Sequence, residues 1–170
     1  MTNALFQEKQ RFNQIWLMAL LAGLVVFGFW GFIQQILLDK PFGDNPESNI
    51  GLIFSTFLPL LIVAFIFVLQ LRTKIDKTGI VYQFWPIHRK EHIIKWEEVS
   101  CAYVRKYSPI MEYGGWGFRT GRKGRALNTS GNMGLQIEFV SGKKLLIGTQ
   151  KPEELQRVLQ KLEIKGKAAN

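Results

Sequence analysis

The chain has 170 residues, of which 47% are hydrophobic, and a formal net charge of +9 at neutral pH. This length leaves room for a membrane hairpin and one small domain, and it excludes a protein of several large domains. The positive charge is concentrated, because residues 72–170 hold 19 of the 22 Lys and Arg residues and 9 of the 13 acidic residues. Because Cys101 is the single cysteine, the chain can form no internal disulfide, which is consistent with a reducing compartment.

Two long apolar runs follow the N-terminal segment 1–14. Residues 15–38 and 50–71 contain no charged side chain. A helix of about 20 residues crosses the roughly 30 Å hydrocarbon core of a bilayer, and each run is at least that long. A soluble protein of this size could not bury two such helices on all sides. The sequence therefore predicts two transmembrane helices joined by the external loop 39–49.

A cleaved signal peptide is the alternative interpretation of the first run. Its apolar stretch is longer than the usual 7–15 residues of a signal peptide, and no A-x-A-like cleavage site follows it. We therefore expect the segment to be retained.

Basic residues flank the two runs on the same side. Lys9 and Arg11 precede the first run, and three basic residues follow the second between residues 72 and 77. The loop 39–49 holds one lysine against three acidic residues. The excess of Lys and Arg on cytoplasmic flanks predicts that both termini are cytoplasmic.

The predicted hairpin contains no ionisable side chain within its spans. Pores and transporters usually carry such groups inside the bilayer, where they line a path for the solute. We therefore expect an anchor, and transport or permeation by an oligomer of hairpins is the alternative.

Beyond the second run the pattern changes to short segments of period two, separated by turn residues. We expect strands at Leu71–Ile75, Ile80–Phe84, His92–Trp96, Ser100–Tyr107, Gly115–Thr120, Arg125–Asn128, Leu135–Phe139 and Lys144–Gly148. A helix is predicted from Pro152, because Leu155, Val158, Leu159 and Leu162 recur at helical spacing. About seven strands and one closing helix predict a small, strongly bent sheet that the helix covers.

Several motifs in this half of the chain carry a resemblance. They are Tyr113-Gly114-Gly115-Trp116-Gly117-Phe118-Arg119, Gly131, Gly134-Leu135, Gly142-Lys143, and the run from Ile147 through Pro152-Glu153-Glu154-Leu155. Residues 72–163 resemble a bacterial pleckstrin-homology-like (PH-like) domain of the kind found behind a two-helix membrane hairpin. The resemblance implies a cytoplasmic domain at 72–165 with a short tail at 166–170, in a bacterial plasma membrane.

The fold that the resemblance implies is α+β: a transmembrane hairpin followed by a seven-stranded antiparallel PH-like barrel or sandwich with a C-terminal helical cap. Two features differ from the eukaryotic PH pattern. The loop between its first strands, Asp76–Gly79, lacks spaced basic residues, and no tryptophan lies between Pro152 and Glu163. Inositide recognition is therefore not carried over.

A glycine-rich basic segment contains the candidate site residues. Arg119, Arg122, Lys123 and Arg125 lie among seven glycines between Gly114 and Gly134. Backbone N–H groups and cations of such a loop can hold anionic lipid headgroups, which attract nearby Lys and Arg residues. The alternative is a long hairpin whose glycines only permit turns and bulges. No nucleotide-binding motif is present in the sequence.

Other chemistry finds little support in the residue pattern. His88 and His92 have helical metal-ligand spacing but lie in strand-forming sequence without an evident third ligand. No serine is set in a G-x-S-x-G motif, and Glu97-Glu98 is expected at a turn. We therefore predict no catalytic residue, metal or cofactor. The positive charge is explained by membrane proximity, so nucleic acid is not expected as a partner.

The sequence thus predicts a non-enzymatic membrane protein that presents its domain as a scaffold or accessory subunit. Its expected partners are another protein, a second copy of the chain, or the anionic membrane surface.

Overall fold

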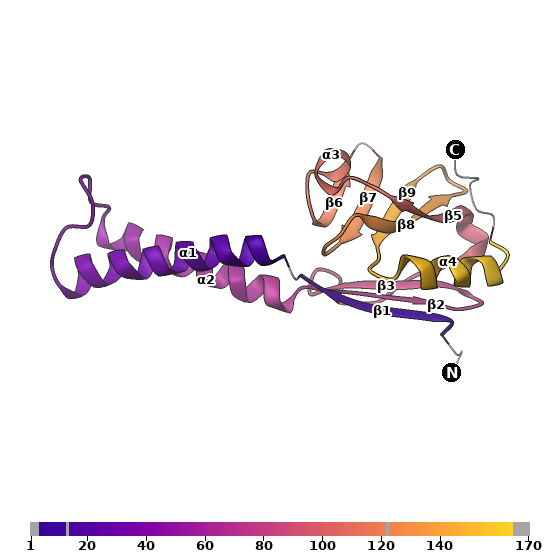
Figure 1. Ribbon diagram of the computed structural model, residues 1–170, viewed down its shortest axis with the longest axis horizontal. Coiled ribbons are helices and arrows are strands. Elements are labelled where there is room, and N and C mark those ends of the chain that lie inside the picture. The colour runs from indigo at the N-terminus through magenta and orange to yellow at the C-terminus, as the bar shows by residue number, and fades with distance from the viewer. Residues whose placement is uncertain (1–3, 13, 122, 165–170) are drawn as a thin grey trace. The chain divides into compact units, whose positions relative to one another are not determined.

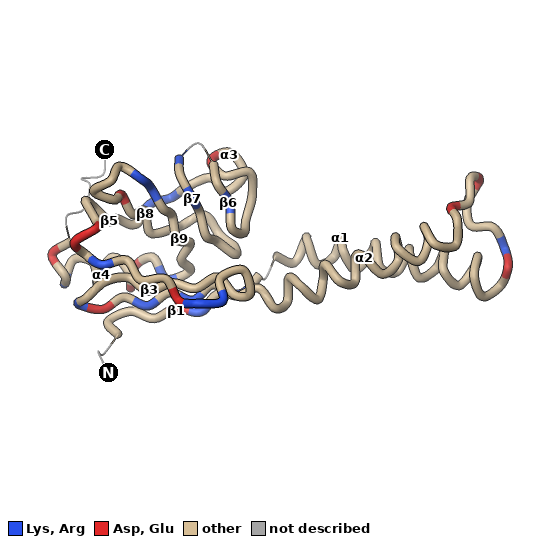
Figure 2. Tube along the Cα trace, turned by 180° about the vertical axis from the view of Figure 1, so that it is seen from behind, with Lys and Arg blue, Asp and Glu red and all other residues tan. Residues whose placement is uncertain are grey.

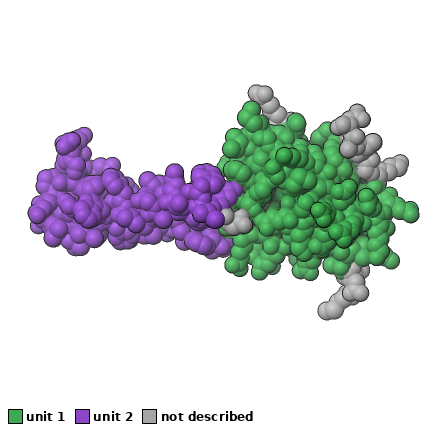
Figure 3. Space-filling model, viewed as in Figure 1, with its two compact units in different colours: residues 1–13, 69–170 green, residues 14–68 purple. Residues whose placement is uncertain are grey.

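The computed structural model describes residues 4–12, 14–121 and 123–164. The chain forms two compact units, one made of residues 1–13 and 69–170 and the other of residues 14–68 (Figure 3). The first unit therefore contains chain segments from before and after the second.

The unit of residues 14–68 is a pair of helices. Helix α1 (Ile15–Phe32) continues into the π-helical turn η1 (Ile33–Leu37), and α2 is Asn49–Val68. The two helices approach closely at Gly28, where a Cβ atom would lie 3.1 Å from the Cα of Thr56. The Thr56 hydroxyl donates to the carbonyl of Gly28 (3.0 Å).

Both helical segments, Ile15–Leu37 and Asn49–Val68, are long and apolar enough to cross a membrane. Most of their large apolar side chains are exposed in the chain. The second helix ends at Val68 rather than at the predicted residue 71, because Gln70 and Leu71 belong to a strand.

The other unit contains two β-sheets (Figure 1). The four-stranded sheet has the order β1-β2-β3-β4, and all its neighbouring strands are antiparallel. Its strands are β1 (Phe6–Arg11), β2 (Gln70–Ile75), β3 (Gly79–Trp85) and β4 (His92–Lys95). The five-stranded sheet has the order β5-β8-β9-β7-β6, in which β7 and β9 are parallel. Its strands are β5 (Val99–Lys106), β6 (Gly117–Gly121), β7 (Gly124–Asn128), β8 (Met133–Phe139) and β9 (Lys144–Gly148).

Three short or closing helices complete this unit. The 3₁₀ turn η2 (Trp96–Glu98) connects the two sheets, and α3 (Pro109–Tyr113) follows β5. Helix α4 (Pro152–Lys161) contacts β1 and β5 and buries Leu155, Val158 and Leu159. These are three of the four residues of the predicted apolar stripe, and the fourth, Leu162, follows the helix and packs partly buried against the core. The closing helix is therefore confirmed.

One continuous core holds the two sheets together. Alternate side chains of strands from both sheets enter it, such as Leu71 and Ile75 of β2 and Leu135 and Ile137 of β8, all of them fully buried. Burial of a Leu or Ile side chain contributes about 1.5–3 kcal/mol, so this period-two pattern stabilises the sandwiched arrangement.

The fold differs from the expected seven-stranded antiparallel barrel. The described residues form nine strands in two sheets, with no closed barrel. All eight strand segments predicted from the sequence are present with small shifts of their ends. The ninth, β1, comes from the segment 1–14, so the prediction that this segment lies outside the domain is wrong. The parallel pairing of β7 with β9 also departs from an all-antiparallel sheet.

Strand β1 is built into the unit by buried polar side chains as well as by backbone pairing. The carboxylate of Glu8 accepts hydrogen bonds from the Thr149 hydroxyl and the Gln150 backbone N–H, both at 2.7 Å. The Gln10 side chain donates to the carbonyl of Gly148 (2.7 Å) and accepts from Thr129 (3.2 Å). A strand from the start of the chain therefore satisfies polar groups near its end.

Candidate functional site

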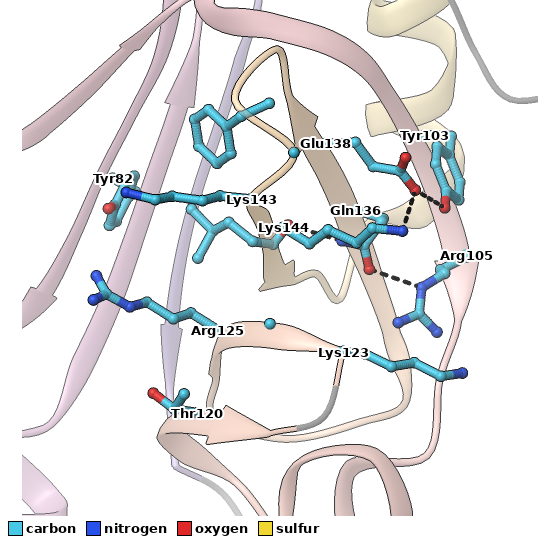
Figure 4. Close-up of a pocket in the computed structure, with 14 residues that line it drawn as sticks. Tyr82, Tyr103, Arg105, Thr120, Lys123, Arg125, Gln136, Glu138, Lys143 and Lys144 are labelled. Atoms are coloured by element: carbon cyan, nitrogen blue, oxygen red, sulfur yellow. Dashed lines mark hydrogen bonds and ion pairs between the residues drawn. The ribbon is translucent and has the colours of Figure 1, made fainter.

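A basic pocket of about 890 Å³ lies on the two-sheet unit where two hairpin turns come together (Figure 4). The hairpin of β6 and β7 contributes Lys123 and Arg125, and the hairpin of β8 and β9 contributes Lys143 and Lys144. Strand β5 adds Arg105. Five cationic side chains thus line one cavity.

The approach of the two hairpins depends on the parallel pairing of β7 with β9. Arg125 is opposite Leu145 in this pairing, so both hairpin turns lie at the same end of the sheet. Gly124 permits the contact, because it adopts a φ of +107° and a Cβ atom at this position would collide with the carbonyl oxygen of Lys144. Any other residue would force the two segments apart.

Arg105 is held in place by a dense set of acceptors. Its guanidinium donates to both carboxylate oxygens of Glu112 (3.2 and 2.8 Å), to Gln136 Oε1 (3.0 Å) and to the Tyr113 hydroxyl (3.2 Å). Such a bidentate pair is stronger and more directional than a single hydrogen bond. Arg105 therefore forms a rigid wall of the pocket.

The remaining lysines and Arg125 divide into two groups. The Nζ atom of Lys123 lies 3.4 Å from Oε2 of Glu112, and that of Lys144 lies 3.3 Å from Oε1 of Glu138. Each of these two lysines therefore pairs with a carboxylate. Among the described residues, Arg125 and Lys143 form no ion pair with a carboxylate. Figure 4 shows these two side chains on the same side of the pocket as Tyr82. They are the cations most available to an incoming anion.

Two tyrosines, Tyr82 and Tyr103, also line the pocket. Burial raises the pKa of Tyr82, and the positive charge of Arg125 opposes this shift. Burial also raises the pKa of Tyr103, and the hydrogen bond that its hydroxyl donates to Glu138 (3.1 Å) adds to the effect. Both phenols are therefore neutral hydrogen-bond donors at neutral pH.

The carboxyl group of Glu112 should make the unit less stable in acid. Burial alone would raise its pKa, but hydrogen bonds from Arg105 and Ser108 and the charges of Arg105 and Lys123 lower it from 4.5 to about 2. The unfolded chain then binds more protons than the folded chain below pH 4.5, so stability is present above that pH and is lost as pH falls toward 2. We expect Glu112→Gln to flatten this part of the stability profile, measured by denaturant unfolding at a series of pH values. An unchanged slope in the variant would contradict this assignment.

The structure describes three of the four candidate residues of the glycine-rich segment, and they do not lie in one group. Lys123 and Arg125 line the pocket. Arg119 is exposed on β6, outside the pocket lining, and its Nε donates to the carbonyl of Trp116 (3.0 Å). Arg122 lies outside the described residues. Two of the four predicted residues are thus brought together, and Arg119 is not part of this group.

The other half of the site is not predicted from local sequence patterns. Arg105, Lys143 and Lys144 come from segments predicted as strands or turns, without a functional role. The adjacent pair Lys143-Lys144 beside Gly142 is a local signal for a basic hairpin turn. No local signal places it beside Arg125, because that contact depends on a parallel pairing between strands that are not consecutive.

The two histidines lie in an aromatic cluster that adjoins the pocket through Tyr82. The ring centroids of His88 and His92 are 4.5 Å apart, and His92 stacks on Tyr82 (5.2 Å). Burial lowers the pKa of His88, and the nearby charge of His92 acts in the same direction. Within residues 4–12, 14–121 and 123–164, no group of three or more His, Cys, Asp or Glu side chains is arranged to hold a metal ion.

Comparison with protein-family models and with curated proteins finds no match to this chain. The PH-like resemblance therefore remains a prediction, and the pocket has to be interpreted from its own chemistry.

Proposed function

We propose that this chain is an integral membrane protein of the bacterial plasma membrane whose cytoplasmic PH-like domain binds an anionic, phosphate-bearing ligand in the basic pocket. It acts as a non-enzymatic binding or scaffold protein. The ligand is a phosphate group presented either by a lipid headgroup or by a soluble molecule.

The charge of the pocket is the observation that carries this proposal. Among the described residues that line the cavity, five are cationic and only Glu138 is acidic, and the carboxylate of Glu138 accepts hydrogen bonds from Tyr103 and Lys144. Phosphate oxygens accept charge-assisted hydrogen bonds from Lys and Arg, which are about twice as strong as neutral ones. The neutral hydroxyl of Tyr82 adds a further donor, whereas the Tyr103 hydroxyl and the Gln136 amide already donate to Glu138 and to backbone carbonyls. These donors support binding, whereas covalent catalysis would need a nucleophile beside a base.

The position of β1 supports a retained hairpin over a cleaved signal peptide. Cleavage after the first apolar run would remove Phe6–Arg11, and with it an edge strand and the buried side chains of Glu8 and Gln10. Because both ends of the helical unit connect to one folded unit, two crossings would return the chain to the side on which it began. This agrees with both termini lying in the cytoplasm.

The test compares variants of the pocket with a control outside it. The full chain, reconstituted in lipid nanodiscs, is titrated with inorganic pyrophosphate and, in a second arm, with a short-chain phosphatidic acid. We expect Arg125→Gln with Lys143→Gln to weaken binding at least about tenfold, because each substitution removes a charged donor. The two arms distinguish a soluble phosphate from a lipid headgroup.

The matched control removes two exposed charges elsewhere, Arg119→Gln with Lys161→Gln. It should leave the affinity nearly unchanged. Equal weakening by the two double variants, or no binding of either probe, would refute the pocket as an anion site.

A further inference from the structure

The four-stranded sheet has a basic outer face near the points where the chain leaves and re-enters the two-sheet unit. Lys9 and Arg11 of β1 and Arg72 of β2 are exposed, and strand alternation directs them away from the core that Phe6 and Leu71 fill. Figure 2 shows positive residues along β1 and the strand beside it. We call Lys9, Arg11, Arg72, Trp85 and Ile87 the juxtamembrane face.

Two cations of this face lie opposite each other, and their repulsion destabilises the pairing of β1 with β2 when no anion is bound. Lys9 is directly opposite Arg72 in the antiparallel register. Like charges in such a pair repel each other, and the neighbouring pair of Arg11 with Gln70 supplies no negative charge. An anion that lies against this face would relieve the repulsion.

Short connections along the chain join these cations to the apolar helices. Only Leu69 separates Val68, the last residue of α2, from Gln70, the first residue of β2. Arg72 is thus four residues beyond the helix, which is at most about 14 Å of extended chain. Arg11 is four residues before α1 begins at Ile15. If the helices cross the bilayer, these side chains lie within reach of its headgroups.

The turn after β3 adds apolar groups at the same end of the sheet. Trp85 is opposite Gln70 in the register and is 40% exposed, and Ile87 is 45% exposed. Arg89 and Lys90 follow with exposed side chains. Trp beside basic residues is typical of chain that lies at a membrane–water interface.

We infer that the juxtamembrane face lies on the anionic headgroups of the bilayer, with Trp85 and Ile87 in the interfacial layer and Lys9, Arg11 and Arg72 above lipid phosphates. This inference rests on the proposed membrane anchoring, but it is independent of the pocket. Charge complementarity and the short connections to the helices favour the bilayer over a soluble partner. The face would hold the domain on the membrane and so fix its orientation.

The experiment places an environment-sensitive fluorophore at Ile87→Cys in a Cys101→Ser background of the full chain. The protein is reconstituted in nanodiscs of phosphatidylcholine alone or with phosphatidylglycerol. We expect a stronger, blue-shifted emission in the anionic discs, quenched by spin-labelled lipid and reversed by high salt. The matched probe site is Val140→Cys, because Val140 is 71% exposed and lies away from the juxtamembrane face. Its backbone N–H donates to the carbonyl of Glu98, which follows the far end of β4. It should report water in both discs.

Charge variants test the electrostatic part. Neutralising Lys9, Arg11 and Arg72 to Gln should lower the docked-to-undocked ratio by roughly 100-fold, since each contributes about a fivefold factor near an anionic surface. Neutralising the exposed residues Lys77, Arg157 and Lys161 to Gln should have little effect. Identical emission in the two kinds of disc, or equal loss in both triple variants, would overturn the inference.

Failure of the membrane proposal itself gives a different result. Resistance of the vesicle-reconstituted chain to extraction by alkaline carbonate reports anchoring without reference to the fluorophore. A chain that is extracted contradicts the anchoring, and a chain that resists extraction while position 87 stays in water contradicts only the docking.

Discussion

Deletion of residues 4–11 is expected to prevent the two-sheet unit from folding, even though these residues lie before the first apolar helix. The deletion removes β1, the buried ring of Phe6, and the side chains of Glu8 and Gln10. It also exposes the edge of β2 that pairs with β1. The Thr149 hydroxyl and the Gln150 N–H then lose their acceptor, the Glu8 carboxylate. Each unsatisfied buried group costs about 1–3 kcal/mol, and the loss of a core Phe costs a further 3–5 kcal/mol. The total of about 5–10 kcal/mol is comparable to the whole stability of a small domain.

Single substitutions make this expectation quantitative. Glu8→Ala should lower the free energy of unfolding by about 3 kcal/mol, because Thr149 and the Gln150 N–H lose a charged acceptor. Gln7→Ala, on the exposed side of the same strand, is the matched control and should change it by less than about 0.5 kcal/mol. Denaturant unfolding of the full chain in mild detergent, followed by circular dichroism, measures both.

A protease-resistant two-sheet unit in the deletion variant would contradict this account. So would equal effects of Glu8→Ala and Gln7→Ala, because the prediction depends on the burial of Glu8.

Replacement of Arg105 by alanine is expected to destabilise the two-sheet unit strongly. Arg105 and Glu112 form a bidentate ion pair whose side chains are only 19% and 14% exposed. Burial alone would lower the pKa of Arg105, but the hydrogen bond and charge of Glu112 raise it overall. Removing the guanidinium leaves the Glu112 carboxylate with Lys123 and backbone donors. We expect a loss of about 3 kcal/mol in the free energy of unfolding.

The matched control is Arg157→Ala. Arg157 also pairs with a glutamate, Glu153, but the two side chains are 77% and 89% exposed. An exposed pair of this kind contributes less than about 0.5 kcal/mol, because water screens it. Thermal unfolding at neutral pH compares the two variants. Similar shifts in the melting temperature would show that the Arg105 pair is not specially stabilising.

Local patterns of the sequence predicted most of the elements correctly. Alternation of apolar and polar residues marked β8, and helical spacing after Pro152 marked α4. Helix α3 was not predicted, because its five residues are too few to show a period. Ser108 and Pro109 at its start and Gly114 at its end are the signals that were available.

Strand β1 was missed for a different reason. Phe6, Glu8 and Gln10 alternate with Gln7, Lys9 and Arg11, so the buried face is largely polar. Period-two analysis looks for apolar residues on one face, and here a carboxylate and an amide occupy that face. Their burial is possible only because Gly148, Thr149 and Gln150 supply partners from the other end of the chain.

The candidate site was predicted in part for a related reason. Lys123 and Arg125 were identified because they are close together in the sequence. Arg105, Lys143 and Lys144 join them only through the pairing of β7 with β9 and of β5 with β8. Arg119 was included in the predicted site because it is close to these residues in the sequence. Its side chain donates a hydrogen bond to the carbonyl of Trp116 and does not line the pocket.

The sequence by itself determined the two apolar helices, the strand segments, the closing helix and the excess of positive charge. These depend on composition and on spacing within a few residues, which a linear pattern records. The tertiary structure alone decided that the first residues complete a sheet, that two hairpins meet to form a basic pocket, and that Lys9 and Arg72 share one face. Each of these depends on pairing between segments far apart in the chain, and their partners cannot be read from local periodicity.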